Sequence, residues 1–303
     1  MPEPVAALAT EGLTKYYGPV IGIEDVNLVV HGGETFGFLG ANGAGKTTTI
    51  RLILDLLRPS RGRATVGGLD CRQDSVRVRQ QIGYLPAEMP VYPEMSGRAY
   101  LAFLARLQHP APDAAWMESL LRRFDVSDTD LARPIRDLSH GMKRKLGILQ
   151  ALMGKAPLLI LDEPTSGLDP LMIEAFVETI RELRAEGCTV FLSSHVLSEV
   201  EKLCDRVGLV SRGRLVKIAA LDEIRDRMPR RVRVVFSQPV STPPPTLAGT
   251  RIVRASPDEW IVEISGPAGP IVQWLGALPV RDMDIETATL EEYVLGLYSE
   301  GTA

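Results

Sequence analysis

The sequence predicts an α/β fold in which helices cover a parallel sheet, and three segments support this prediction. Glu34–Leu39 has the character of a buried strand and leads through a glycine-rich loop into a helix over Thr48–Leu54. Pro157–Asp162 is a short apolar run that ends in an acid, as a central parallel strand often does. A helix over about 170–186 then precedes a further strand, Thr189–Ser193. Such alternation of strands and helices is typical of parallel sheets.

The glycine-rich loop fits the phosphate-binding pattern G-x-x-x-x-G-K-[ST] at every fixed position. Its residues are Gly40, Ala41, Asn42, Gly43, Ala44, Gly45, Lys46 and Thr47, with Thr48 opening the following helix. Glycines allow successive N–H groups to turn inward toward phosphate oxygens. Lys46 reaches the β- and γ-phosphates, and the Thr47 hydroxyl can hold Mg²⁺. Because the positive end of the helix dipole faces the same site, the loop predicts nucleotide binding.

The acidic strand end at Asp162-Glu163 is the second informative feature. Asp162 closes an apolar strand where a carboxylate linked to Mg²⁺ would lie beside the phosphate loop. Glu163 follows directly and is placed to orient or deprotonate an attacking water. Acids also end strands for structural reasons, but beside a phosphate loop the catalytic interpretation is favoured.

The composition limits the possible classes of protein. With 303 residues, the chain is long enough for one large domain and a small one. Its 45% apolar and 24% charged content are ordinary for a soluble globular protein. A net charge of −4 gives no electrostatic reason to expect a nucleic-acid partner. We also expect no signal peptide and no membrane span, since no run approaches the roughly 20 apolar residues required.

Three widely spaced cysteines, Cys71, Cys188 and Cys204, predict reduced and mostly buried thiols in a reducing compartment. His31 and His109 have no motif around them and are interpreted as surface residues.

The N-terminal part, residues 5–39, is predicted to form short strands, with turns at Gly18-Pro19 and Gly32-Gly33. Residues from about 94 to 152 are mostly helical, with apolar residues spaced by three and four in Ala99–Leu107 and Trp116–Phe124.

The composition changes near Met228, which predicts a small α/β accessory domain over 229–303. It contains expected strands at Arg230–Phe236, Arg251–Ala255 and Trp260–Ser265 and an expected helix at Leu290–Tyr298. The stretch Ser237–Pro245 is predicted to be a loop, and the charge run Arg225–Arg233 a solvated face.

Several further motifs give the chain a resemblance to the ATPase subunit of an ATP-binding cassette (ABC) transporter over about residues 5–225. Asp137–Lys143 resembles the family's signature sequence, Ser166–Asp169 its D-loop, and His195 its switch histidine. Tyr17 resembles the aromatic residue that stacks on adenine. GTPases and kinases lack the signature sequence, so the resemblance excludes them.

The resemblance implies a fold with a phosphate-loop parallel sheet core, an antiparallel β subdomain and a helical subdomain at about 94–152. These form one ATPase domain over 5–228. It also implies a homodimer or heterodimer in which the phosphate loop of one subunit meets Ser139 and Gly141 of the other across ATP. Asp169 would lie at the same site, and His195 would bond the γ-phosphate while holding Glu163.

The sequence departs from the family pattern in two places. The signature has His140 and Met142 where glycine and glutamine are common. The position that usually holds the Mg²⁺-sensing glutamine is Ala87, followed by Glu88. A carboxylate binds Mg²⁺ better than an amide, so Glu88 is a candidate third metal ligand beside Thr47 and Asp162. The alternative is that water fills the position left by Ala87.

The leading hypothesis is an ATP-hydrolysing subunit that powers a separate membrane permease, with export favoured over import by resemblance to export-type (ABC-2-like) subunits. Such a subunit would be cytoplasmic and held to the inner face of the membrane by its permease. The second hypothesis is a soluble ABC ATPase with no permease and a regulatory or nucleic-acid-linked role. A third is a regulator that binds ATP without turnover, against which Lys46, Asp162, Glu163 and His195 argue.

Overall fold

The computed structural model describes residues 6–89, 92–108, 110–227, 230–240, 249–266 and 268–287. The chain divides into two compact units, Met1–Ala219 and Ala220–Ala303. The predicted helix at Leu290–Tyr298, the prolines at 243–245 and His109 lie outside the described residues.

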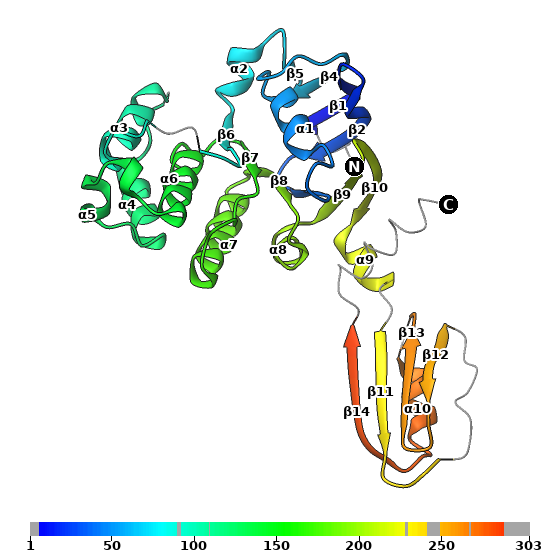
Figure 1. The fold of residues 1–303 in the computed structure, drawn as a ribbon. Helices are drawn as coiled ribbons and strands as arrows, with labels where there is room; N and C mark the ends of the chain where they lie inside the picture. The colour runs from blue at the N-terminus through cyan, green and yellow to red at the C-terminus, as the bar shows by residue number, and fades with distance from the viewer. Residues whose placement is uncertain are drawn as a thin grey trace. The chain divides into compact units, whose positions relative to one another are not determined.

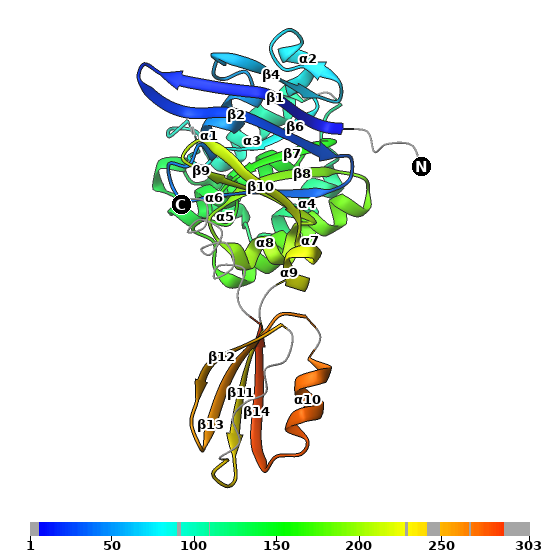
Figure 2. The ribbon, with the colours of Figure 1, turned by 90° about the vertical axis from the view of Figure 1, so that its right-hand side faces the viewer.

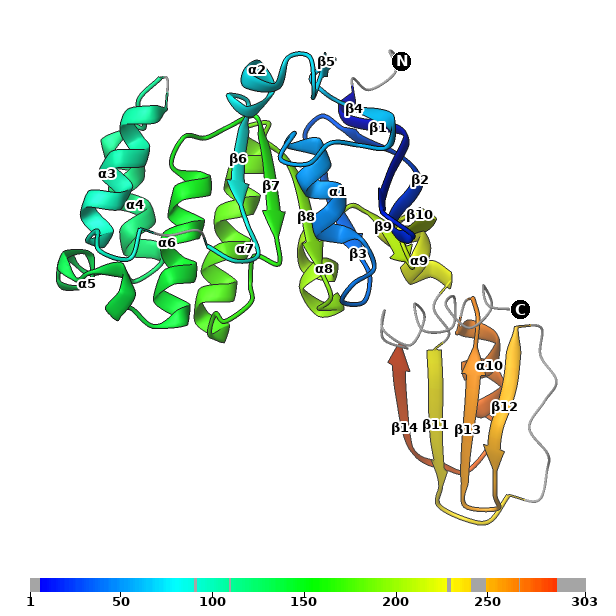
Figure 3. The same ribbon diagram turned by 45° about the horizontal axis from the view of Figure 1, so that its top comes forward.

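A six-stranded sheet forms the centre of the first unit, with the order β10-β9-β3-β8-β7-β6 (Figure 3). The pairs from β9 to β6 are parallel. Every residue of the central strands β3, β7 and β8 is buried, as is typical of a sheet covered on both faces. The strands are β3 (Thr35–Leu39), β6 (Ile82–Leu85), β7 (Leu158–Asp162), β8 (Thr189–Ser194), β9 (Arg206–Ser211) and β10 (Arg214–Ala220).

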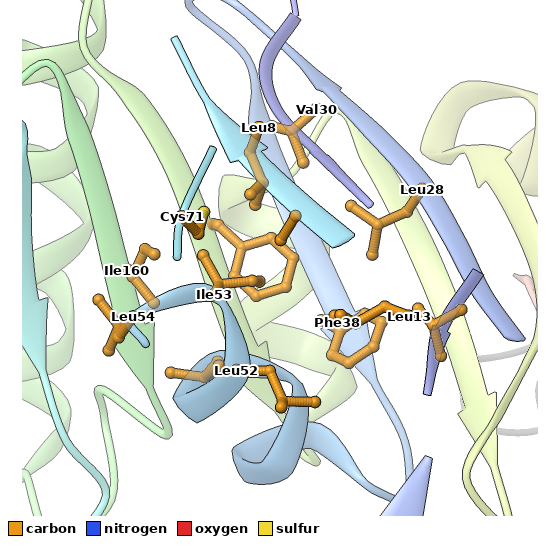
Figure 4. Close-up of a cluster of buried hydrophobic side chains, with 14 of the residues drawn as sticks. Leu8, Leu13, Leu28, Val30, Phe38, Leu52, Ile53, Leu54, Cys71 and Ile160 are labelled. Atoms are coloured by element: carbon orange, nitrogen blue, oxygen red, sulfur yellow. The ribbon is translucent and has the colours of Figure 1, made fainter. Parts of the chain in front are cut away.

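A second, antiparallel sheet lies along one side of the first, with helix α1 (Lys46–Ile53) between the two (Figures 1 and 2). Leu52 and Ile53 of α1 enter a core that also receives Leu8, Leu28 and Ile160 from strands of both sheets (Figure 4). This shared core fixes the start of α1 relative to the strands. The antiparallel strands are β1 (Ala6–Tyr17), β2 (Val20–His31), β4 (Arg61–Val66) and β5 (Leu69–Asp70), with helix α2 (Ser75–Arg79) after them.

The remaining helices of this unit cover the other face of the central sheet and extend beyond its β6 edge (Figure 1). Most begin where a polar side chain caps the first turn, which explains their starting points. The caps are Ser96, Asp113, Ser127, Ser139 and Asp169. The helices are α3 (Gly97–Leu107), α4 (Ala114–Arg123), α5 (Asp128–Ala132), the 3₁₀ turn η1 (Ile135–Asp137), α6 (His140–Leu152), α7 (Pro170–Ala185) and α8 (Leu197–Leu203).

The second unit contains a four-stranded antiparallel sheet in the order β12-β13-β11-β14, with helix α10 against one face. Trp260 is buried under this helix and stacks on Trp274, with ring centroids 5.1 Å apart. The other face carries ion pairs such as Arg231–Glu263 and Arg233–Glu259, so this part of the predicted charge run is solvated as expected. The elements are α9 (Leu221–Arg227), β11 (Arg230–Phe236), β12 (Thr250–Ala255), β13 (Glu259–Ile264), α10 (Gly269–Leu275) and β14 (Val280–Thr287).

Some local expectations were wrong. The strands β1 and β2 are longer than the short strands expected, because they form one continuous hairpin around Gly18-Pro19. Helix α1 begins at Lys46 rather than at Thr48. The elements α10 and β14 were not anticipated, because their sequences show neither the clear helical nor the clear strand spacing of apolar residues. His31, expected at the surface, is half-buried, whereas the three cysteines are buried and free as predicted.

Replacing Gly83 with alanine should destabilise the first unit, because β6 and α6 meet at this glycine. A Cβ atom there would lie 2.2 Å from the Ala151 carbonyl oxygen and 2.6 Å from Leu159 Cδ2. We expect a loss of about 1–3 kcal/mol, the usual scale of overpacking. Urea denaturation of the variant and the wild type measures this loss in the free energy of unfolding. The control is Gly97→Ala, whose Cβ would approach nothing closer than 3.4 Å. Equal midpoints for both variants would contradict this account of the contact.

Candidate active site

The phosphate loop lies between the end of β3 and the start of α1, and close approaches at two glycines fix its path. A Cβ on Gly40 would lie 2.4 Å from the Val210 carbonyl oxygen, so only glycine fits beside β9. Gly45 has φ of +111° and would meet both Ile23 and the Gly22 carbonyl. The loop is therefore held by neighbouring strands as well as by its own sequence. Lys46 and Thr47 fall in the first turn of α1, where helix N–H groups lack intrahelical partners.

Asp162 lies at the end of β7 with no solvent exposure. The Ser193 hydroxyl donates to its Oδ1, whereas its buried Oδ2 has no hydrogen-bond partner in the described part of the chain. An ionised buried carboxylate oxygen requires a partner. This oxygen suits Mg²⁺, which takes one or two protein oxygens and completes its shell with water and phosphate. The Thr47 hydroxyl stays the predicted second protein ligand. The described residues contain no cluster of three or more His, Cys, Asp or Glu side chains that could hold a metal ion.

The carboxylate of Glu163 is held from two sides. Its Oε1 lies 3.3 Å from Lys46 Nζ, and its Oε2 lies 2.6 Å from His195 Nδ1. Because an ionised carboxylate only accepts hydrogen bonds, Nδ1 is the protonated nitrogen of His195 in this contact. The site thus brings together three of the predicted functional residues. Lys46 also donates to the Gly40 carbonyl oxygen at 2.6 Å, which ties the group to the phosphate loop.

The backbone of Glu163 is in the left-handed region, with φ of +51°. Such a conformation costs roughly 1–3 kcal/mol outside glycine and persists only where neighbours impose it. Here the Glu163 N–H donates to the Ser193 carbonyl and hydroxyl oxygens, both at 3.1 Å. Arg144 donates to the Glu163 carbonyl oxygen from the other side. The strain therefore serves to aim the carboxylate at the phosphate loop.

Arg144, on α6, is a functional residue that sequence reasoning missed. Its guanidinium is buried, with 3% exposure, and donates to five backbone carbonyl oxygens. Burial lowers the pKa of Arg144 to about 10, although Asp162 and Glu163 oppose the shift. The acceptors lie in two segments, Pro86-Ala87 and Asp162–Pro164. Arg144 thus joins the signature helix, the segment after β6 and the acidic strand end.

Tyr17, predicted to stack on adenine, lies at the end of β1 and is 46% exposed. Its ring rests over Gly22, where a Cβ would lie 2.6 Å from Tyr17 Cε2. The carbonyl of Gly22 in turn approaches Gly45. The aromatic side chain is therefore one residue removed from the phosphate loop and accessible.

The signature-like segment leads into α6, with Ser139 as the helix cap, and Ser139 and His140 are exposed. Ser139 Oγ accepts from the Met142 N–H at 3.2 Å. The ring of His140 lies against Gly167, and the Gly141 Cα faces the Gly167 carbonyl. Asp169 caps α7 and accepts from the Met172 N–H at 3.0 Å. Within the described residues, the start of α6 therefore contacts the loop around Gly167, which leads to α7.

Ala87 and Glu88 are both exposed. Arg144 donates to the Ala87 carbonyl oxygen at 3.2 Å, which fixes the backbone here. Over the part of the chain that the structure describes, no contact connects Glu88 to Thr47 or Asp162. Its role as a metal ligand stays a prediction.

Comparison with known proteins places this geometry in a family. The family model described as ABC transporter matches residues 23–166. The linearmycin resistance ATP-binding protein LnrL of Bacillus subtilis is 36% identical over 222 residues, covering 73% of this chain and 71% of the relative. The chain belongs to the ABC transporter family. A daunorubicin resistance ATP-binding protein of Streptomyces coeruleorubidus is 37% identical over 221 residues, covering 72% and 70% of the two chains.

Solved structures agree on the fold. An ATP-binding subunit of an ABC transporter aligns with a TM-score of 0.67 and 34% identity, over 72% of this chain and 92% of the other. The predicted ABC family, fold and ATPase class are confirmed. No described helix of this ABC subunit is long and apolar enough to cross a membrane.

The sequence of this ABC subunit contains one signal that Arg144 is buried. Arg144, Gly147, Ile148 and Ala151 follow the three- and four-residue spacing of the buried face of α6. A charged residue at such a position must be paired, because an unpaired buried charge is very costly. Its partners, in contrast, are carbonyl groups of distant segments and leave no trace in the sequence.

Arg144→Ala should lower the free energy of unfolding by about 1–3 kcal/mol or more, because it leaves buried carbonyl groups without a donor. Arg144→Lys should recover only part of this loss, since one ammonium cannot reproduce the planar fork of donors. Urea denaturation provides the comparison. Lys145→Ala, on the same helix but with a partly exposed side chain, is the matched control. A midpoint for Arg144→Ala equal to that of the control would refute the bonding role.

Proposed function

We propose that this ABC subunit hydrolyses ATP at a site shared between two ATPase subunits and thereby drives a separate membrane permease that exports its substrate. The carboxylate of Glu163, held between Lys46 and His195 beside Asp162, is the observation that carries this proposal. The export direction is supported by relatives named for resistance to linearmycin and daunorubicin.

In this proposal the phosphate loop binds the β- and γ-phosphates of ATP through its backbone N–H groups and Lys46. Thr47 and Asp162 would hold Mg²⁺, and the bound ion would neutralise charge on the phosphate oxygens. Glu163 accepts the proton of the attacking water. His195 keeps Glu163 aimed through the contact of its Nδ1 with Glu163 Oε2. Tyr17 stacks on the adenine.

The signature segment completes the site of a second subunit. Ser139 and His140 are exposed at the start of α6, where the unpaired N–H groups of a helix N-terminus suit the γ-phosphate. A partner subunit would present these groups to the phosphate loop, as the resemblance to the ABC family implies. Asp169 lies at the same interface. Whether the partner is a copy or a related subunit, the interface uses both surfaces of each subunit.

The domain roles follow from this arrangement. We assign residues 5–228 to the ATPase domain, with its helical subdomain at about 94–152, and 229–303 to an accessory domain. The permease would hold the subunit at the cytoplasmic face of the membrane. A dimer that functions without a permease is the alternative, and co-purification with a membrane protein encoded by a neighbouring gene decides between them.

Glu163→Gln should retain ATP binding and lose turnover, because the amide keeps the shape of the side chain but cannot accept the proton. ATP and Mg²⁺ should then trap a closed dimer, measured by size-exclusion chromatography alongside phosphate release. The control is Glu178→Gln, an exposed glutamate on α7. Wild-type turnover in Glu163→Gln would remove Glu163 as the base.

Glu88→Ala should raise the Mg²⁺ concentration needed for half-maximal hydrolysis if the carboxylate contributes a ligand. Titration of Mg²⁺ at fixed ATP measures the shift. Identical Mg²⁺ dependence in variant and wild type would assign the position to water instead.

A further inference from the structure

Glu199 is a half-buried carboxylate in the first turn of α8, four residues after His195. The hydroxyl of Thr165 donates to its Oε2. Burial raises the pKa of Glu199, and the charge of Glu163 adds to this shift while the Thr165 hydrogen bond opposes it. The proposed reaction assigns no role to Thr165 or Glu199. Thr165 lies two residues after Glu163, and Glu199 lies four residues after His195.

Thr165 belongs to the loop that leaves Glu163. Its side chain is buried, with 6% exposure. The loop folds on itself through hydrogen bonds from the Ser166 N–H to the Glu163 carbonyl and from the Leu168 N–H to the Thr165 carbonyl. A displacement of Thr165 would therefore be passed directly to the backbone of Glu163, whose left-handed conformation depends on its neighbours.

Two contacts attach this loop to the segment 195–199. The first joins His195 Nδ1 to Glu163 Oε2, but the His195 side chain is 51% exposed. The second is the more buried contact between Thr165 and Glu199. One attachment point would leave the segment able to pivot, whereas two fix its orientation. Because Thr165 is buried and Glu199 half-buried, water competes less for this hydrogen bond than for the contact of the exposed His195 side chain.

We propose that Glu199 is a positioning residue for ATP hydrolysis: through Thr165 it fixes the loop after Glu163 to the segment that carries His195, so that the two meet in register. This inference rests on the proposed function of Glu163. Glu199 acts through other residues and contacts no reacting atom. Its loss should therefore slow the chemical step while leaving ATP binding at the phosphate loop almost unchanged.

The test compares disruptive with conservative variants of the full chain. Thr165→Val and Glu199→Ala remove the hydrogen bond, whereas Thr165→Ser and Glu199→Gln keep a hydroxyl donor and an oxygen acceptor. Steady-state hydrolysis with ATP and Mg²⁺ gives kcat and KM. We expect kcat to fall roughly 10- to 100-fold in the disruptive variants, the scale of lost alignment, with KM for ATP within about twofold. The conservative variants should retain most of the rate.

A double-variant cycle adds a second readout. If one hydrogen bond carries the effect, Thr165→Val with Glu199→Ala should be no slower than the slower single variant. Glu178→Ala, an exposed carboxylate on α7, is the matched control and should keep the wild-type rate. Thermal unfolding identifies any variant that fails to fold, and the nearly isosteric Thr165→Val keeps the test decisive if Glu199→Ala does.

Wild-type kcat in folded Thr165→Val and Glu199→Ala would overturn the inference while leaving Glu163 as the base. Equal loss in conservative and disruptive variants, with KM rising in parallel, would also overturn it and indicate a general structural role. Failure of the proposed function is a different result, since the wild-type chain would then show no turnover with ATP and Mg²⁺.

Discussion

The order of strands in the central sheet is the constraint on which the site depends. Strands β3 and β7 both pair with β8 in parallel, so the carboxyl ends of the three strands lie at the same end of the sheet. The phosphate loop follows β3. Asp162 is the last residue of β7 and Glu163 comes directly after it, and His195 follows β8. Groups separated by more than a hundred residues thereby come within hydrogen-bond distance. Ligand sites at the carboxyl ends of parallel strands are the general rule for open α/β sheets.

Hydrogen bonds to the backbone then hold Glu163, at the end of β7, in a conformation that is unfavourable for a residue other than glycine. Glu163 has a left-handed backbone, supported by Ser193 on one side and Arg144 on the other. Arg144 also bonds the carbonyl groups of Pro86 and Ala87. The departure from the family pattern at Ala87 therefore leaves the backbone contact intact, because a carbonyl acceptor does not depend on the side chain. At His140, the other departure from the family pattern, the ring packs on Gly167.

The proposed function requires two subunits. In that proposal the ends of the strands supply the phosphate loop, the metal-binding oxygens and the base, and the start of α6, capped by Ser139, serves the site of the partner subunit. A helix N-terminus with exposed N–H groups suits an anion. Closing two such subunits around ATP would link nucleotide binding to a change in their separation, which is the movement that a permease can follow.

The sequence by itself determined the parallel sheet and the glycine-rich loop between strand and helix, because strand–loop–helix patterns constrain short contiguous segments. It also singled out Lys46, Glu163 and His195, which the structure brings into contact. It did not reveal Arg144, Ser193, Thr165 or Glu199. Their roles come from contacts with backbone or side chains distant along the chain, which only tertiary packing brings together. The same reason left α10 unanticipated, because its buried residues Ile271 and Leu275 face a core formed by strands of the second unit. Strand β14 was missed for another reason: its residues 281–286 are exposed and contain no run of apolar side chains that would mark a strand.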